Sequence, residues 1–174
     1  MYRTNKKVDR VPERSYEMGE RVLMEDDILE NDNMRGYSIQ VDSVSLLECG
    51  AFMDKYGISE LVPADELLPE RVYDVTVTIE NEDNKDTGID LTTVRMQAPD
   101  IFLDINSTFF DLMYPKLEGS MAIALREDSS MEFHLAFNVR RDWFRESTWK
   151  RLDDAGWKLV LTKYPVKKYV KIEV

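Results

Sequence analysis

Residues 131–139 alternate strictly between apolar side chains and polar or small ones. The odd-numbered positions are Met, Phe, Leu, Phe and Val, and the even-numbered positions are Glu, His, Ala and Asn. Successive residues of a strand point to opposite faces, so this pattern predicts a β-strand with one face in a core and one towards water. The same alternation recurs at residues 37–41 and 73–80. Because half-buried strands are typical of antiparallel sheets, the pattern argues against a doubly buried parallel sheet.

The remaining segments predict a mostly β chain. Two short helices are expected in loops, at residues 50–57 and 147–156, each with a glycine at its C-terminal end. A single open sheet would leave five apolar side chains of one strand uncovered, so we predict an antiparallel two-sheet β-sandwich. The expected strands are 21–24, 37–47, 71–80, 89–97, a segment from 101 towards 112, a hairpin of 119–125 with 131–139, and then 157–161 and 169–174.

The charge of the chain restricts its partners. The 174 residues include 23 Lys and Arg and 34 Asp and Glu, which gives a formal net charge of −11. Such a surface repels phosphate backbones, and we find no basic stripe with interleaved aromatic residues, so we expect no binding to nucleic acid. The single cysteine, Cys49, excludes an intramolecular disulfide and a multi-cysteine metal site, and a half-buried free thiol is expected.

The first residues differ in composition from the rest of the chain. Residues 2–16 contain five basic side chains and little that a core could bury. We therefore expect residues 1–16 to form a flexible basic arm and residues 17–174 to form the sandwich domain. On this view, removal of the arm leaves the stability of the domain unchanged. No run of about eighteen apolar residues occurs, so attachment to a membrane would need a segment outside this chain.

Motifs for catalysis are mostly missing. His134 is the single histidine, and the alternation places it on the polar face of its strand beside Glu132 and Ala136. We therefore interpret His134 as a solvated side chain of the strand, which is simpler than a role as a catalytic base. Glycine loops for phosphate and the nucleophile elbow do not occur, and paired carboxylates are unspecific among 34 acidic residues. The sequence therefore predicts no enzyme activity and no cofactor.

One segment has a spacing similar to that of a calcium loop. Oxygen-bearing side chains lie at alternate positions, at Glu82, Asn84, Asp86 and Asp90. However, the glycine comes one residue late, and the twelfth position is Thr93 instead of glutamate. A hairpin turn rich in Asn, Asp and Gly is therefore the favoured interpretation, with a weak Ca²⁺ site as the alternative.

The tryptophans and one glycosylation motif allow an interpretation that involves sugars. Trp143, Trp149 and Trp157 could form an aromatic platform for a glycan or a peptide. We instead expect Trp149 and Leu152 to close one end of the sandwich, and Trp157 to pack inward. Asn106 begins an Asn-Ser-Thr acceptor pattern, which has meaning only in a eukaryotic secretory route.

Several of these segments together resemble a known family. Residues 16–22 are Tyr-Glu-Met-Gly-Glu-Arg-Val, residues 37–41 are Tyr-Ser-Ile-Gln-Val, and residues 75–82 are Val-Thr-Val-Thr-Ile-Glu-Asn-Glu. With the late segments 131–139 and 157–161, this order resembles immunoglobulin-like domains of unknown function in cell-envelope and lipoprotein-type proteins of Gram-positive bacteria. The resemblance covers residues 16–174. It implies an immunoglobulin-like sandwich outside the cell, tethered through a segment absent from this chain, and it supplies no catalytic residues.

Three hypotheses about function are open. The first is an extracellular or envelope-associated bacterial module that has no catalytic activity and binds a protein or another envelope component. The second is a cytoplasmic acidic protein that masks a basic partner, which would account for the charge of −11. The third is a glycan-binding or carbohydrate-active sandwich, based on the tryptophans and carboxylates. We favour the first hypothesis, whose partner the sequence does not identify.

Overall fold

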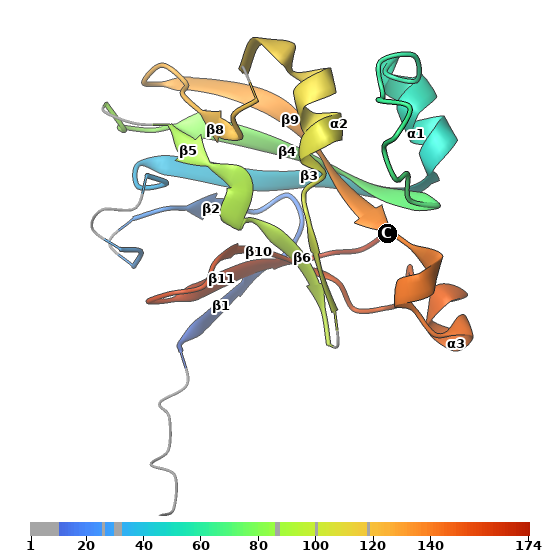
Figure 1. Cartoon of the computed structure of the whole chain (residues 1–174). Coiled ribbons are helices and arrows are strands. Elements are labelled where there is room, and N and C mark those ends of the chain that lie inside the picture. Colours follow the sequence, from blue (N-terminus) through green and yellow to red (C-terminus); the bar gives the residue numbers. More distant parts are fainter. Residues whose placement is uncertain (1–10, 26, 30–32, 86–87, 100, 118) are drawn as a thin grey trace, which may run out of the picture.

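A computed structural model describes residues 11–25, 27–29, 33–85, 88–99, 101–117 and 119–174 of the chain (Figure 1). These residues form two packed sheets with short helices at their margins. The prediction of a mostly β, two-sheet sandwich with short helices is confirmed. None of the helices in this part of the chain has the length and apolar character that a membrane span needs.

One sheet contains four strands, which pair in an antiparallel manner in the order β2-β3-β4-β9. Their bounds are β2 (Arg21–Leu23), β3 (Tyr37–Glu48), β4 (Arg71–Asn81) and β9 (Ser129–Val139). β4 pairs along its whole length with β3 at one edge and with β9 at the other. The three strictly alternating segments of the sequence are thus neighbours in one sheet.

The other large sheet contains five strands in the order β1-β11-β10-β6-β7. Their bounds are β1 (Glu13–Tyr16), β6 (Arg95–Ala98), β7 (Ile101–Asp104), β10 (Lys158–Thr162) and β11 (Lys167–Lys171). All pairs are antiparallel except β1 with β11, which is parallel. A short pair, β5 (Ile89–Asp90) with β8 (Ala122–Ile123), lies apart from both sheets in the hydrogen-bonding pattern.

The core lies between the two large sheets. Val75 and Val77 of β4 and Leu135 of β9 belong to the same buried cluster as Met96 and Leu159 of the other sheet. Each such side chain stabilises the fold by about 1.5–3 kcal/mol when it is fully buried. The apolar face of the alternating strands is therefore buried as predicted, and its burial stabilises the fold because a second sheet covers it.

A β-bulge in β3 accounts for a change of phase in its apolar pattern. The pairing register shifts between Val41 and Ser43, which leaves Asp42 as the extra residue. Before the bulge the odd-numbered apolar residues face the core, and after it the even-numbered Val44 and Leu46 pack against the core. Because of the extra residue, two consecutive polar side chains, Asp42 and Ser43, lie on the outer face.

Two short helices, α1 (Cys49–Tyr56) and α2 (Ser107–Met113), cover one end of the outer face of the four-stranded sheet. A third, α3 (Glu146–Trp149), lies apart from them (Figure 1), and 3₁₀ turns occur at Leu91–Thr93, Pro115–Leu117 and Arg141–Trp143. Phe52 of α1 stacks on Phe109 of α2 with 5.4 Å between ring centres, above Val72 and Ala136 of the sheet. As predicted, the first helix ends at Gly57, whose φ of 64° is left-handed.

Two expected strands end earlier than predicted. The strand expected at 89–97 is interrupted because the Asp90 side chain accepts a hydrogen bond from Thr92 N at 2.9 Å and starts a 3₁₀ turn. The segment expected to extend from 101 towards 112 becomes helical after β7. Asn106 caps α2 by accepting a hydrogen bond from Phe109 N at 2.9 Å. In both places a local side-chain contact overrides the alternating pattern.

The expected hairpin of 119–125 with 131–139 is wrong. β8 pairs with β5, whereas β9 pairs with β4, because the long edge of β4 offers a partner for every residue of β9. The helix expected at 147–156 is shortened to α3. The chain turns after Trp149, and Trp157 then enters the core with Nε1 donating to Leu152 O at 2.9 Å.

The N-terminal boundary expected at residue 16 lies too late in the chain. Residues Glu13–Tyr16 form β1, which pairs with β11 from Lys167 to Val170. A hydrogen bond from Lys167 N to Pro12 O at 2.8 Å precedes this ladder. The last part of the expected arm is therefore a strand of the sheet, while residues 1–10 lie outside the described residues.

We predict that a chain starting at residue 11 is more stable than a chain starting at residue 17. The shorter chain loses the β1 ladder and the ion pair between Arg14 and Asp27 at 2.6 Å. The loss of these hydrogen bonds should lower the free energy of unfolding by about 1–3 kcal/mol. Urea unfolding of the two chains measures the difference, and equal midpoints would show that β1 does not contribute.

We also predict that Gly36→Ala is much more destabilising than Gly19→Ala. Both glycines have a φ of 81°, so alanine meets the same backbone strain at the two positions. A Cβ atom at Gly36 would lie 2.5 Å from Asp83 Oδ1 and 2.8 Å from Asn84 N, whereas the space around Gly19 is open. The additional clash should cost about 1–3 kcal/mol in the free energy of unfolding. Equal losses in urea titrations would contradict the close packing of this turn.

Candidate functional site

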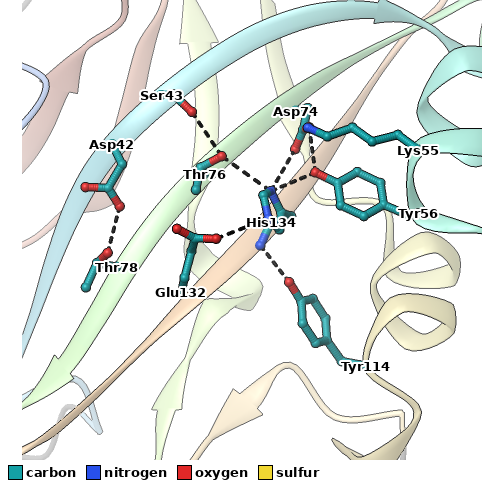
Figure 2. Close-up of polar contacts among 10 residues, drawn as sticks. All are labelled: Asp42, Ser43, Lys55, Tyr56, Asp74, Thr76, Thr78, Tyr114, Glu132 and His134. Atoms are coloured by element: carbon teal, nitrogen blue, oxygen red, sulfur yellow. Dashed lines mark hydrogen bonds and ion pairs between the residues drawn. The ribbon is translucent and has the colours of Figure 1, made fainter.

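The outer face of the four-stranded sheet has a polar part beside α1 and α2 (Figure 2). Strand pairing places Thr76 of β4 between Ser43 of β3 and His134 of β9. The Ser43 hydroxyl donates to Thr76 Oγ1 at 3.0 Å, and the Thr78 hydroxyl donates to Asp42 at 2.7 Å. These residues, apart from the bulge residue, are the alternate positions of strands whose other residues form the core. The alternation therefore places a polar row on one face.

Asp74 is the buried charge of this face, with a side-chain exposure of 1%. Two groups at the end of α1 contact its Oδ2 atom, because Lys55 Nζ and the Tyr56 hydroxyl each lie 2.7 Å away. Its Oδ1 atom lies 3.4 Å from His134 Nδ1. A buried carboxylate costs several kcal/mol unless it is paired and hydrogen-bonded. These contacts are therefore a condition for the burial of Asp74.

The imidazole of His134 lies at the centre of the network (Figure 2). Its Nδ1 atom is 2.7 Å from the Tyr56 hydroxyl and 3.3 Å from Thr76 Oγ1. Its Nε2 atom is 3.5 Å from Glu132 Oε1. The backbone N–H of His134 donates to the Tyr114 hydroxyl at 2.7 Å. His134 is thus in contact with side chains from four places in the fold, which are β4, β9, α1 and Tyr114 after α2.

The Tyr56 hydroxyl indicates where the protons of this network lie. The hydroxyl has one hydrogen, and donating it to the Asp74 carboxylate leaves the oxygen to accept Nδ1–H from His134. The other ring nitrogen of His134, Nε2, lies 3.5 Å from the Glu132 carboxylate. Nucleophilic catalysis would need a hydroxyl or thiol at that nitrogen. Among the contacts of the described residues, the hydroxyls lie on the Nδ1 side.

The phenols around the site hold their protons strongly. Burial raises the pKa of the Tyr56 phenol, and the hydrogen bond to Asp74 raises the pKa further. Burial also raises the pKa of Tyr114 and of Tyr73. These hydroxyls are therefore protonated at neutral pH, and the Tyr56 hydroxyl donates a hydrogen bond to Asp74.

The prediction of a solvated His134 is wrong in part. The alternation correctly places the residue on the outer face, but its side chain is only 22% exposed and contacts four other side chains, while its backbone N–H contacts Tyr114. Two of these partners, Tyr56 of α1 and Tyr114 directly after α2, come from distant parts of the sequence. Strand periodicity does not show that helices cover a polar face, so the sequence analysis missed Asp74 and Tyr56 as members of a site.

The residues of the possible calcium loop have other partners in the structure. Glu82 forms an ion pair with an arginine of β2, and Asp90 caps the 3₁₀ turn that follows it. Asn84 donates to a backbone carbonyl at 2.7 Å, and Asp86 lies outside the described residues. Within the described ranges, no group of three or more His, Cys, Asp or Glu side chains is arranged to hold a metal ion. The described partners agree with a structural turn.

The tryptophans do not share a platform. Trp157 is buried, and Leu152 is buried beside it, as predicted. Trp149 is half-buried between two guanidinium groups, 4.9 and 5.2 Å from its ring centre. Trp143 is 48% exposed, and the Arg140 guanidinium lies 5.8 Å from its ring centre. The interpretation as a glycan platform therefore loses most of its basis.

Asn106 and Cys49 are buried. Asn106 is 8% exposed, and its side chain caps α2 and donates to Asn138 Oδ1 at 2.9 Å. The folded domain therefore does not present Asn106 for glycosylation. Cys49, the first residue of α1, belongs to the apolar cluster of Phe52 and Val72, and burial raises the pKa of its thiol.

Large exposed apolar side chains gather on another part of the molecule. Phe102 of β7 is 57% exposed and Trp143 is 48% exposed, and both line one hollow together with Glu66. Leu67 and Leu68 follow Glu66 in the chain and are also exposed. We call the exposed Phe102 and Trp143, which line this hollow, the apolar surface. The sequence analysis missed this surface, although a large aromatic residue at an outward position of an alternating strand is a usable signal.

We predict that the stability of the domain falls above about pH 10, the pKa of an unfolded tyrosine. Tyr56, Tyr73 and Tyr114 have raised pKa values in the folded chain, so the unfolded chain loses these protons first. The unfolded state then binds fewer protons than the native state, and the free energy of unfolding decreases as pH rises.

Tyr56→Phe should reduce this dependence by up to about 1.4 kcal/mol per pH unit, less the screening that its partial exposure allows. Tyr164→Phe, at an exposed tyrosine, is the matched control and should have the wild-type slope. Urea unfolding at several alkaline pH values measures the slopes. Equal slopes for the wild type and Tyr56→Phe would contradict the assignment of the phenol proton.

Comparison with known proteins places the chain in a family. A family model described as a domain of unknown function, DUF5028, matches residues 13–168. The match begins at the first residue of β1, in agreement with the corrected N-terminal limit. No curated protein and no solved structure matches the chain. The resemblance to domains of unknown function is confirmed at this level, and the chain belongs to the DUF5028 family.

Proposed function

We propose that this domain is a non-catalytic module that binds a partner protein at the cell envelope. The observation that carries the proposal is the apolar surface, on which the exposed Phe102 and Trp143 line one hollow. Exposed apolar groups that gather from separate segments are typical of interaction sites, whereas single ones are ordinary. Here a strand and a 3₁₀ turn contribute to one surface. The partner accordingly presents apolar side chains to it.

The network around His134 supports a role without catalysis. Its Nδ1 side contacts Asp74, Tyr56 and Thr76, and its Nε2 side contacts the Glu132 carboxylate. Among the described residues, the groups at Nε2 do not include a nucleophile that the imidazole could activate. The same contacts hold α1 and the end of α2 against the sheet. We therefore assign the network to the architecture of the module.

The location outside the cell is part of the proposal, and its support is the resemblance drawn from the sequence, with which the cysteine content is compatible. The resemblance is to domains of Gram-positive envelope proteins, and the chain has a single cysteine, so its fold needs no disulfide in either compartment. Residues 1–10, which are rich in Lys and Arg, would then connect the domain to a tethering segment. Protease added to intact cells distinguishes an external domain from a protected one.

Site-specific photocrosslinking tests the binding function in the cells that make the protein. A photoreactive phenylalanine analogue replaces Phe102 in one variant and Tyr164 in a matched control. Both side chains are exposed, but Tyr164 lies in the turn at the opposite end of β10 from Trp157 and the apolar surface. We expect a discrete crosslinked species from position 102 and none from position 164. If neither position, or both equally, gives a product, the apolar surface is not a specific binding site.

A further inference from the structure

A second pocket lies between the end of the β6–β7 hairpin and the segment that contains α3. The hairpin contributes Ala98 and Ile101 to its wall, and the other segment contributes Trp143, Phe144 and Arg145. Its volume is about 580 Å³. Sites for small molecules usually have volumes of about 300–1,000 Å³ and are lined mainly by apolar and aromatic side chains. The pocket therefore has the size and wall of a small-molecule site, and we call it the α3 pocket.

Aromatic rings form most of the apolar wall of the α3 pocket. Trp143 is 48% exposed, whereas Phe144 is half-buried and Trp157 is buried at the base. Trp157 Nε1 donates to Leu152 O at 2.9 Å, so the polar edge of this indole is already satisfied. Phe144 contacts the ring of Trp149 with 6.2 Å between ring centres. These contacts position the rings before a ligand arrives, and a flat aromatic group suits them because aromatic pairs gain more than buried area alone.

Arg145 is the cation in the wall of the α3 pocket. Residues 140–148 contain three arginines and two acidic residues. Asp142 pairs with Arg140 at 3.1 Å. Glu146 pairs with Arg141. Both carboxylates of the segment are thus engaged by other arginines, and Arg145 forms no ion pair with any residue that the structure describes. A positive charge therefore lines the pocket, although the whole chain carries a charge of −11.

Thr148 adds a hydroxyl near this charge. Its backbone N–H donates to Arg145 O at 3.0 Å, and residues three apart lie on the same face of a helical turn. Both side chains line the α3 pocket. A guanidinium binds a carboxylate through two parallel hydrogen bonds, and a hydroxyl can donate one more. A phosphate monoester would bring a charge of about −1.5 to −2, and a carboxylate brings one negative charge, which is the closer match to one arginine.

We propose that the α3 pocket binds a small aromatic carboxylic acid. The carboxylate accepts hydrogen bonds from the Arg145 guanidinium and the Thr148 hydroxyl, and the aromatic body lies against Trp143 and Ile101. This site goes beyond the proposed function, because its ligand is a small molecule and its wall differs from that of the hollow with Phe102. The two share only Trp143 among the residues that the structure places in their walls.

The indole N–H resonances of the intact chain in NMR spectra test the proposal. Trp143 and Trp157 line the α3 pocket, whereas Trp149 does not. The probes are 2-naphthoate and 3-phenylpropanoate, each compared with its neutral amide. We expect both acids to shift the Trp143 and Trp157 resonances more than that of Trp149, with a Kd on the order of 1 mM for ligands of this size. Each amide should bind at least about tenfold more weakly, because it lacks the charge that Arg145 meets.

Variants of Arg145 test the assigned contact. Arg145→Gln removes the charge from an exposed side chain and should weaken binding of both acids at least about tenfold, while binding of the amides is unchanged. Arg145→Lys keeps the charge but not the planar pair of donors, so its affinity should be intermediate. Arg151→Gln, the same change of charge at an exposed arginine outside the wall of the pocket, is the matched control and should bind the acids normally.

The proposal is overturned if neither acid shifts the Trp143 and Trp157 resonances, if the acids and amides bind equally, or if a folded Arg145→Gln variant binds the acids as the wild type does. If that variant does not fold, the comparison of acids with amides on the wild-type chain decides alone. Photocrosslinking from position 102 tests the partner protein and not this ligand. The two proposals therefore fail separately.

Discussion

The burial of β4 on both faces is the constraint on which the rest of the structure depends. The strand pairs with neighbours along both edges, and most of its residues are buried although every second one is polar or charged. Its apolar face requires the second sheet, and its other face requires a cover, because Val72 and Asp74 are also withdrawn from water. α1 and α2 supply that cover by packing Phe52 and Phe109 above Val72. The positions of both helices, and of the groups around His134, follow from this strand.

The cover explains why a charged residue can occupy the centre of a sheet. Lys55 and Tyr56 are consecutive residues at the end of α1, and both reach the same oxygen of Asp74. Replacing a buried ion pair by apolar residues is often neutral or stabilising, so such a network is a weak source of stability. Its geometric effect is larger, since one carboxylate fixes the end of α1 above β4. His134 extends the same effect to β9 and to Tyr114 after α2.

The sequence predicts the long elements well and the site poorly, for a physical reason. Sustained alternation is decided by burial of one face, which explains why strands of a sandwich were predicted at residues 37–47, 71–80 and 131–139, where β3, β4 and β9 lie. Short segments are decided by single contacts, such as the caps made by Asp90 and Asn106, and the pattern fails there. The network around Asp74 combines residues from helices and strands far apart in sequence. Periodicity assigns each residue a face but not a partner across that face.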